Sequence, residues 1–139
     1  MPILNVKLCV PPSQETSVKI AAVLTDLTVE ILKKKRELTA VVIEYVAPTE
    51  WYIAGTALAA QLHRSFHLDI KVTEGTNTQD EKAAYIRQVF SSMESIIESL
   101  ASASYIVIHD IQGDSWGYQG QTQAFRSIKD KGDSSNAAS

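Results

Sequence analysis

Apolar and polar residues alternate near the start of the chain and then recur at helical spacing. Residues 4–10 alternate as in a strand with one buried face. After Pro11-Pro12, Ser13 is the expected N-cap of a helix whose apolar positions continue to about residue 34. Residues 39–46 are apolar and β-branched, which favours a second strand. The first half of the chain therefore predicts a β–α–β unit.

The second half repeats this pattern. Residues 66–73 predict a strand, and residues 75–77 predict a turn. Thr78 and Glu81 are spaced as a capping box for a helix that reaches about residue 100. Residues 105–111 then predict the last strand.

The two halves also share sequence. Trp51-Tyr52-Ile53-Ala54-Gly55 recurs 65 residues later as Trp116-Gly117-Tyr118-Gln119-Gly120, and the same offset places Val41–Ile43 on Ile106–Ile108. Because β–α–β crossovers join parallel strands, two copies predict an α/β (α+β) fold with a four-stranded sheet and two helices on one face. The other face mixes apolar and charged positions, so we expect further copies of the chain to cover it.

These patterns define one domain over residues 1–126. Repeat one spans about residues 2–56 and repeat two about residues 66–121, with a connector of unassigned structure over residues 55–64. Residues 127–139 are polar and are predicted to be disordered.

Composition narrows the function classes. With 139 residues, 45% hydrophobic and 21% charged, the chain is typical of one soluble domain. A net charge of −3 disfavours nucleic acid, and no apolar run is long enough to predict a membrane span or a signal peptide. The single cysteine, Cys9, favours a cytoplasmic location. No Cys/His cluster has metal-ligand spacing, so we expect no metal.

Pro2 is the residue with candidate chemistry. Removal of Met1 would give the chain a secondary amine at the start of its first strand. An α-amino group ordinarily titrates near ~8, and desolvation lowers that pKa. A buried N-terminal proline is therefore suited to act as a base or a nucleophile near neutral pH.

Pro2, the two β–α–β repeats and the aromatic-plus-glycine segments together resemble the tautomerase superfamily. The second repeat is similar to 4-oxalocrotonate tautomerase at Glu74-Gly75, at residues 79–82 and 86–89, and at residues 116–120. The whole layout resembles fused members such as malonate semialdehyde decarboxylase and macrophage migration inhibitory factor. The resemblance implies a homotrimer, a pocket around Pro2 completed by a neighbouring subunit, and proton transfer on a small enol or 2-keto acid without a cofactor.

The resemblance also suggests roles for individual residues. Pro2 matches the catalytic proline, and Trp116 falls where an aromatic residue forms a wall of the pocket. Tyr105 falls where other members carry a substrate-contacting arginine or a pocket tyrosine, and Glu37 lies near the water-activating aspartate of the decarboxylase. Plainer roles also fit these residue types: Trp116 as a core or interface aromatic, Tyr105 as an ordinary strand residue and Glu37 as a solvated carboxylate.

The chain departs from the family in its two strand-to-helix turns. Neither residues 11–13 nor residues 75–77 contain the arginine that related enzymes use to hold a carboxylate. Arg64, His63 or Lys34 would have to supply the cation. Three readings stay open: a tautomerase or isomerase with Pro2 as base, a decarboxylase- or dehalogenase-like lyase or hydratase with Pro2 as acid and Glu37 activating water, and a non-enzymatic trimeric binding protein.

Overall fold

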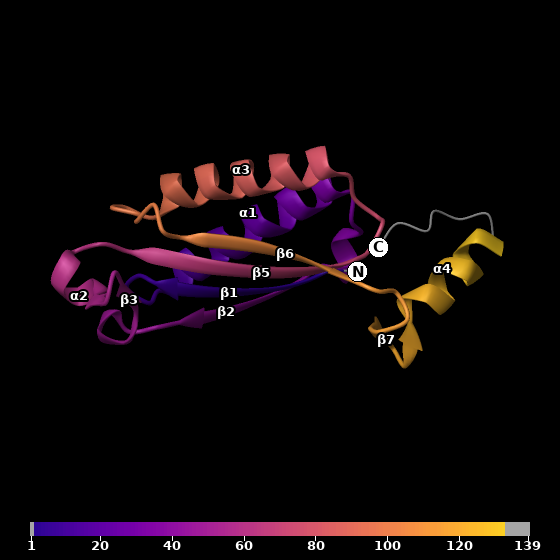
Figure 1. Cartoon of the computed structure of the whole chain (residues 1–139), viewed down its shortest axis with the longest axis horizontal. Helices are drawn as coiled ribbons and strands as arrows, with labels where there is room; N and C mark the ends of the chain where they lie inside the picture. The colour runs from indigo at the N-terminus through magenta and orange to yellow at the C-terminus, as the bar shows by residue number, and fades with distance from the viewer. Residues whose placement is uncertain (1, 133–139) are drawn as a thin grey trace.

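A four-stranded sheet forms the centre of the computed structural model, which describes residues 2–132 (Figure 1). The strands are β1 (Ile3–Cys9), β2 (Ala40–Tyr45), β5 (Ser65–Thr73) and β6 (Tyr105–Ile111), and they lie in the order β2-β1-β5-β6. β1 is parallel to β2 and β5 is parallel to β6, whereas β1 and β5 are antiparallel. The predicted pair of β–α–β units is therefore confirmed, with the two repeats joined along β1 and β5.

Two long helices cover one face of this sheet. They are α1 (Gln14–Leu32) and α3 (Gln79–Ile96), which lie side by side above the strands (Figure 1). The predicted caps are confirmed: Ser13 accepts a hydrogen bond from the amide of Thr16, and Thr78 and Glu81 form a complete capping box. Each cap satisfies amide donors that the first helical turn leaves without partners.

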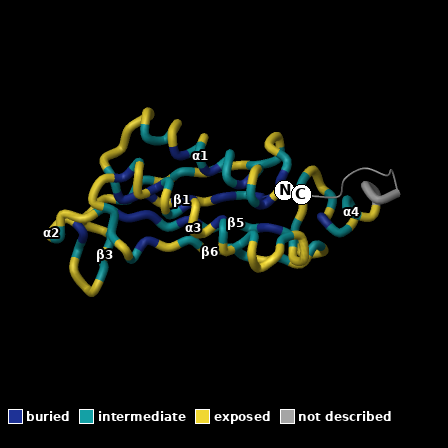
Figure 2. The backbone as a smooth tube through the Cα atoms, turned by 90° about the horizontal axis from the view of Figure 1, so that it is seen from above, coloured by how far each residue is buried: buried dark blue, intermediate teal, exposed yellow. Residues whose placement is uncertain are grey.

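The buried positions of the central strands and the helices form the core. They include Leu4, Val6 and Leu8 of β1 and the matching positions of β5, and Figure 2 shows buried segments along both strands. Helix α3 buries Tyr85 fully, whereas the neighbouring Ile86 is 40% exposed. Tyr85 can be buried because its hydroxyl reaches Thr28 Oγ1 of α1 at 2.8 Å.

Each repeat ends in a small hairpin and a helix. The first repeat has β3 (Tyr52–Ile53), β4 (Thr56–Ala57) and α2 (Leu58–Gln61); the second has β7 (Gly117–Tyr118), β8 (Gln121–Thr122) and α4 (Gln123–Gly132). Both hairpins turn through two residues with positive φ, Ala54-Gly55 in the first and Gln119-Gly120 in the second. The short 3₁₀ helices η1 (Arg36–Leu38) and η2 (Pro48–Glu50) flank β2. The repeat seen in the sequence therefore extends through residues 55–64, to which the sequence alone assigned no structure.

Helix α4 corrects the predicted polar tail. Residues 127–132 belong to this helix, although they were expected to be disordered, while residues 133–139 lie outside the described part of the chain. The hydroxyl of Thr122 accepts a hydrogen bond from the amide of Phe125, as an N-cap does. Within residues 2–132, no helix combines the length and the hydropathy that a membrane crossing requires.

The sheet face opposite α1 and α3 carries both charged and apolar side chains. Val42, Tyr105 and Val107 are 49%, 64% and 37% exposed on it. The register places Glu44, Lys7, His67 and Tyr105 in one row across this face and Val42, Asn5, Asp69 and Val107 in the next. We call this surface the open face.

Candidate active site

Pro2 lies at the end of the sheet where β1 and β2 begin and β5 ends. The residue is buried, and its carbonyl oxygen accepts a hydrogen bond from the amide of Ala40 at 3.3 Å. Ile3 pairs with Lys71, so extending the antiparallel register by one residue places Pro2 opposite Val72. Pro2 is thereby held between the start of β2 and the turn that joins β5 to α3.

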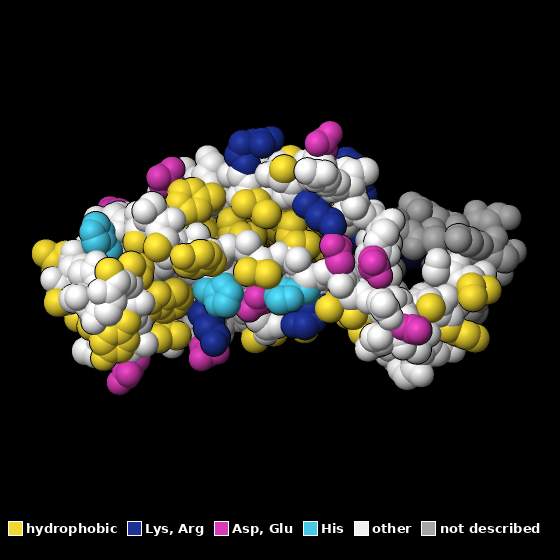
Figure 3. Space-filling view, in the orientation of Figure 1, with side chains coloured by type: hydrophobic (Ala, Val, Ile, Leu, Met, Phe, Trp, Pro, Cys, Tyr) yellow, Lys and Arg dark blue, Asp and Glu magenta, His cyan; other side chains and the backbone are white. Residues whose placement is uncertain are grey.

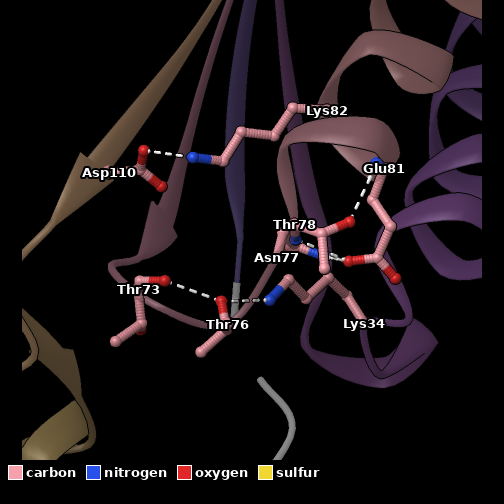
Figure 4. A network of polar contacts seen from close by, with 8 residues as sticks. All are labelled: Lys34, Thr73, Thr76, Asn77, Thr78, Glu81, Lys82 and Asp110. Atoms are coloured by element: carbon pink, nitrogen blue, oxygen red, sulfur yellow. Dashed lines mark hydrogen bonds and ion pairs between the residues drawn. The ribbon is translucent and has the colours of Figure 1, made fainter.

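Lys34 reaches that turn from the end of α1. Its side chain is 4% exposed, and its Nζ donates a hydrogen bond to Thr76 Oγ1 at 2.8 Å (Figure 4). The hydroxyl of Thr76 donates in turn to the carbonyl oxygen of Thr73 at 2.6 Å. Asn77 Nδ2 donates to the carbonyl oxygen of Leu32 at 2.9 Å, which ties the turn to α1. The ammonium group of Lys34, a residue of the first repeat, therefore lies at the strand-to-helix turn of the second repeat.

Burial changes the protonation of Lys34. Desolvation lowers the pKa of its ammonium group to about 8, and the charges of Glu81 and Asp110 oppose that shift. Asp110 is itself paired with Lys82, and Glu81 is held in the capping box (Figure 4). Lys34 is therefore largely a cation at neutral pH, but its proton is lost more easily than that of an exposed lysine.

A cavity of about 610 Å³ opens beside Lys34. It is bordered by the end of α1, the turn after β5, and the start of α4. We call it the Lys34 cavity. Pro2 is not in its lining, but Thr73 is, and Thr73 is the neighbour of Val72. The cavity and Pro2 therefore share one end of the sheet.

Glu37 and Trp116 lie toward this same end. Glu37 is exposed on η1, three residues before Ala40, and has no side-chain hydrogen bond or ion pair with the other residues that the structure describes. Trp116 is half-buried just before β7, in the segment that extends beyond the end of the sheet (Figure 1). Its indole Nε1 is buried without a hydrogen-bond partner in the described chain. An unpaired buried donor is costly, which makes this N–H a candidate contact for a ligand.

Tyr105 and Arg64 lie at the opposite end of the sheet. Tyr105 begins β6 and pairs with His67, four residues along β5 from Lys71. At ~3.3 Å per residue, Tyr105 is about 13 Å along the sheet from the position of Lys71, beside which β1 begins. Arg64 precedes β5 and its backbone pairs with residues 99–101. Neither side chain belongs to the Pro2 end of its own chain.

Two sets of polar residues were missed by the sequence analysis. Thr76 was read only as part of a turn, because its partner Lys34 is 42 residues away. On the open face, Asp69 accepts from His109 Nε2 at 2.8 Å and lies 3.4 Å from His67 Nε2. His109 is thus a hydrogen-bonded residue of the sheet, and Figure 3 shows histidine and acidic side chains gathered on this side of the molecule. Cross-strand register was the only signal for this cluster.

The charges around Asp69 favour its ionised form. Partial burial alone would raise its pKa, but the hydrogen bond from His109 and the charges of His67, His109 and Lys71 hold the pKa below its ordinary value. Within residues 2–132, no group of three or more His, Cys, Asp or Glu side chains has the arrangement of a metal site.

The chain belongs to the family of tautomerase enzymes, whose model matches residues 2–61 and again residues 67–126. Its fold is similar to that of a fused 4-OT asymmetric trimer, with 22% identity, a TM-score of 0.75, and coverage of 86% of this chain and 94% of that one. It is also similar to a macrophage migration inhibitory factor-like protein from Entamoeba histolytica, with 17% identity, a TM-score of 0.72, and coverage of 87% and 97%. A third similar structure is Pt0534 inactivated by 2-oxo-3-pentynoate, with 13% identity, a TM-score of 0.76, and coverage of 86% and 94%. No curated protein sequence matches the chain.

Proposed function

We propose that this protein is a cofactor-free tautomerase that uses the amine of Pro2 as the general base on a small enol or 2-keto acid. The observation that carries the proposal is the position of Pro2, buried at the sheet end beside the turn that holds the buried ammonium group of Lys34. An amine base and a carboxylate-holding cation are the two groups that keto–enol transfer on such an acid requires.

Pro2 would act after Met1 has been removed. Desolvation by its neighbours favours the neutral amine, which can accept the proton of the enol hydroxyl. The resulting secondary ammonium then delivers a proton to the adjacent carbon, so the enol becomes the ketone and the amine is regenerated. A placed base of this kind contributes about 10²–10⁴-fold to the rate.

Lys34 would hold the carboxylate of the substrate. Its ammonium group lies in the turn where the enzymes that the chain resembles carry arginine. A lysine offers a point charge rather than the two-bond grip of a guanidinium, so we expect weaker selection for dicarboxylates and for small, highly charged acids. Poor turnover of 3-chloroacrylate and malonate semialdehyde, relative to phenylenolpyruvate, follows from this assignment.

A neighbouring subunit would complete the pocket. We propose a homotrimer, as the fused 4-OT structures described as trimers suggest. Tyr105 is 64% exposed on the open face, at the end of the sheet away from its own Pro2, so in this scheme it orients substrate at the Pro2 of another copy. Trp116, with its unpaired indole N–H, would form a wall of the pocket. Arg64, an alternative cation in the sequence analysis, has no role in this site.

The test is ketonisation of phenylenolpyruvate by the trimmed protein and by three variants. Pro2→Ala should lose most of the rate enhancement of the base, and Lys34→Gln should raise KM more than it lowers kcat. Lys35→Gln is the matched control, because this neighbouring lysine lies outside the Lys34 cavity. Full activity of Pro2→Ala would exclude the proposed base, and absence of activity in the parent would favour the non-enzymatic binding protein.

A lyase or hydratase that uses Glu37 is the second candidate. The observation that favours it is that Glu37 lies toward the Pro2 end without a hydrogen bond or ion pair to the other described residues. In that reaction Pro2 is the acid and the Glu37 carboxylate activates water. Loss of decarboxylation or dehalogenation in Glu37→Gln, with ketonisation unchanged, would establish it; no such activity in the parent would exclude it.

A further inference from the structure

A second cavity lies at the opposite end of the sheet from Pro2. It has a volume of about 720 Å³ and is bordered by the ends of β1 and β2, the prolines that follow them, and α2. Its lining residues include the apolar Leu58 and Leu62, the thiol-bearing Cys9, and the polar residues Arg64 and His63. We call it the Arg64 cavity. Figure 3 shows hydrophobic side chains gathered at the end of the molecule that holds α2.

The Arg64 cavity is the repeat-related counterpart of the Lys34 cavity. The Arg64 cavity is lined by Pro48, Leu58 and Ala59. The Lys34 cavity is lined by the residues 65 positions later in the sequence, which are Gly113, Gln123 and Ala124. The same backbone hydrogen bond closes each hairpin onto the helix that follows it. The carbonyl oxygen of Trp51 accepts a hydrogen bond from the amide of Leu58, and that of Trp116 accepts one from the amide of Gln123, each at 2.9 Å. The duplicated unit therefore builds one type of cavity twice.

The second copy lacks the base. With a gap of one residue, the repeat aligns Asn5–Leu8 with Asp69–Val72 and therefore aligns Pro2 with Phe66, which lies inside β5 with an ordinary peptide nitrogen. No N-terminal amine can therefore form at this position. A ligand in the Arg64 cavity would be bound without being converted by this chemistry.

Although the Arg64 cavity has no N-terminal amine, the cationic residue Arg64 is part of its lining. The backbone of Arg64 is fixed by hydrogen bonds to the carbonyl oxygen of Ser99 at 3.1 Å and from the amide of Ala101 at 2.8 Å. Its guanidinium group has no ion pair or hydrogen bond with the other residues that the structure describes. A planar guanidinium grips a carboxylate with two parallel hydrogen bonds, and about 720 Å³ is a typical size for a small-molecule site.

We propose that the Arg64 cavity is a second ligand site, which binds an apolar monocarboxylate without turnover. Arg64 holds the carboxylate, and the prolines and the leucines of α2 surround the hydrocarbon part. This site depends on the fold and on Arg64 alone, so it stands or falls independently of the chemistry assigned to Pro2.

Cys9 provides a direct measurement of occupancy. It is the single cysteine of the chain, it lines the Arg64 cavity, and it is 2% exposed. Burial raises the pKa of its thiol, so labelling with N-ethylmaleimide is slow and is best followed at mildly alkaline pH. We expect 3-phenylpropanoate, which has no keto or enol group, to slow this labelling at least about tenfold at saturation, as intact mass would show.

Two variants separate the cavities. Arg64→Gln should weaken the protection of Cys9 by 3-phenylpropanoate at least about tenfold, because the charged partner of the carboxylate is lost. Ala124→Phe is the matched control: it obstructs the Lys34 cavity at the position equivalent to Ala59 and should leave the protection unchanged. Equal protection in Arg64→Gln, or loss of protection in Ala124→Phe, would overturn the proposal.

A neighbouring copy is the competing occupant. Helix α4 exposes Phe125 and Ile128, at 52% and 73%, and these side chains could enter an apolar cavity of another chain. If 3-phenylpropanoate protects Cys9 only in the double variant Phe125→Ser/Ile128→Ser, then α4 fills the cavity in the intact protein and the ligand site proposed here is wrong. Absence of protection in both proteins would also refute it.

Discussion

Lys34 is a charged residue that is buried in the described part of the chain. Its protonation state matters for the proposed chemistry because the fold determines its pKa. Most lysines keep their charge to high pH, whereas burial brings the pKa of this one to about 8. Since a carboxylate is held only by the charged form, substrate binding should weaken as the pH rises through this value. Pro2 has the opposite requirement, because a base must lose its proton to act.

The pH profile of kcat/KM should therefore be bell-shaped. The rising limb reports deprotonation of Pro2, and the falling limb, near pH 8, reports deprotonation of Lys34. Lys34→Arg keeps its charge throughout this range, so its falling limb should move upward by more than one pH unit. Steady-state rates with phenylenolpyruvate across the range measure it. A falling limb that does not move in Lys34→Arg would show that another group titrates there.

The two long helices are joined by one buried hydrogen bond. The hydroxyl of Thr28 donates to the carbonyl oxygen of Leu24 at 2.7 Å, so its oxygen accepts the proton of the Tyr85 hydroxyl. Burial raises the pKa of Tyr85 to about 12, which keeps this donor protonated at ordinary pH. The pair fixes the register of α1 against α3.

Removal of the Thr28 hydroxyl should lower the free energy of unfolding more than removal of the Tyr85 hydroxyl. Tyr85→Phe loses the donor and should lower the free energy of unfolding by about 1 kcal/mol, whereas Thr28→Val leaves the Tyr85 hydroxyl buried and unpaired and should cost about 2–3 kcal/mol. Urea unfolding measures both. Tyr45→Phe is the control, since its hydroxyl bonds Ser17 nearer the surface and should matter less. The reverse order of costs would contradict the assigned donor direction.

The β7–β8 hairpin depends on Gly117. A Cβ atom at this position would lie 1.9 Å from the carbonyl oxygen of Gln121, so any side chain must separate the two strands. Gly117→Ala should abolish the protection of the hairpin amides in hydrogen exchange while leaving that of β5 unchanged. Tyr52, at the equivalent position of the first hairpin, already carries a large side chain, and Tyr52→Ala should leave its hairpin paired. Retained protection in Gly117→Ala would show that the hairpin can adjust.

Element length decided how much of the fold could be predicted from the sequence. Helix α1 has 19 residues and β1 has 7, so their periodicity is unmistakable. The strands of the two hairpins have two residues each, too few to show a period, and the connector 55–64 was therefore left unassigned. Helix α4 was missed because its polar composition resembled a disordered tail.

The candidate site was less predictable than the fold because its residues meet through tertiary structure. Pro2 was proposed from its place in the sequence, and Lys34 was one of several possible cations. Only the fold brings Lys34 to Thr76 and leaves Arg64 at the opposite end of the sheet. Register, rather than residue type, separates the Pro2 end from the Tyr105 end.

At the scale of the whole molecule, the open face should form the contact between subunits. It exposes Val42, Tyr105 and Val107 on the side of the sheet opposite α1 and α3. Its ionised groups include both signs, with Lys7 and Lys71 beside Glu44 and Asp69. Apolar exposure with balanced charge is suited to association, whereas a new unpaired charge buried in such a contact is costly.

Val42→Asp should therefore dissociate the proposed trimer. The new carboxylate would lie two residues from Glu44 on β2, where association would bury it near a like charge. Val18→Asp is the matched control, because Val18 is similarly exposed, at 58%, on α1 in the helical layer. Light scattering at micromolar concentration should give about three chain masses for the parent and for Val18→Asp, and about one for Val42→Asp.

Because Tyr105 is assigned to the Pro2 of another copy, Val42→Asp should also lose ketonisation at concentrations where it is monomeric. A monomeric variant with the full kcat/KM of the parent would show that each chain completes its own site, and would remove Tyr105 from the mechanism.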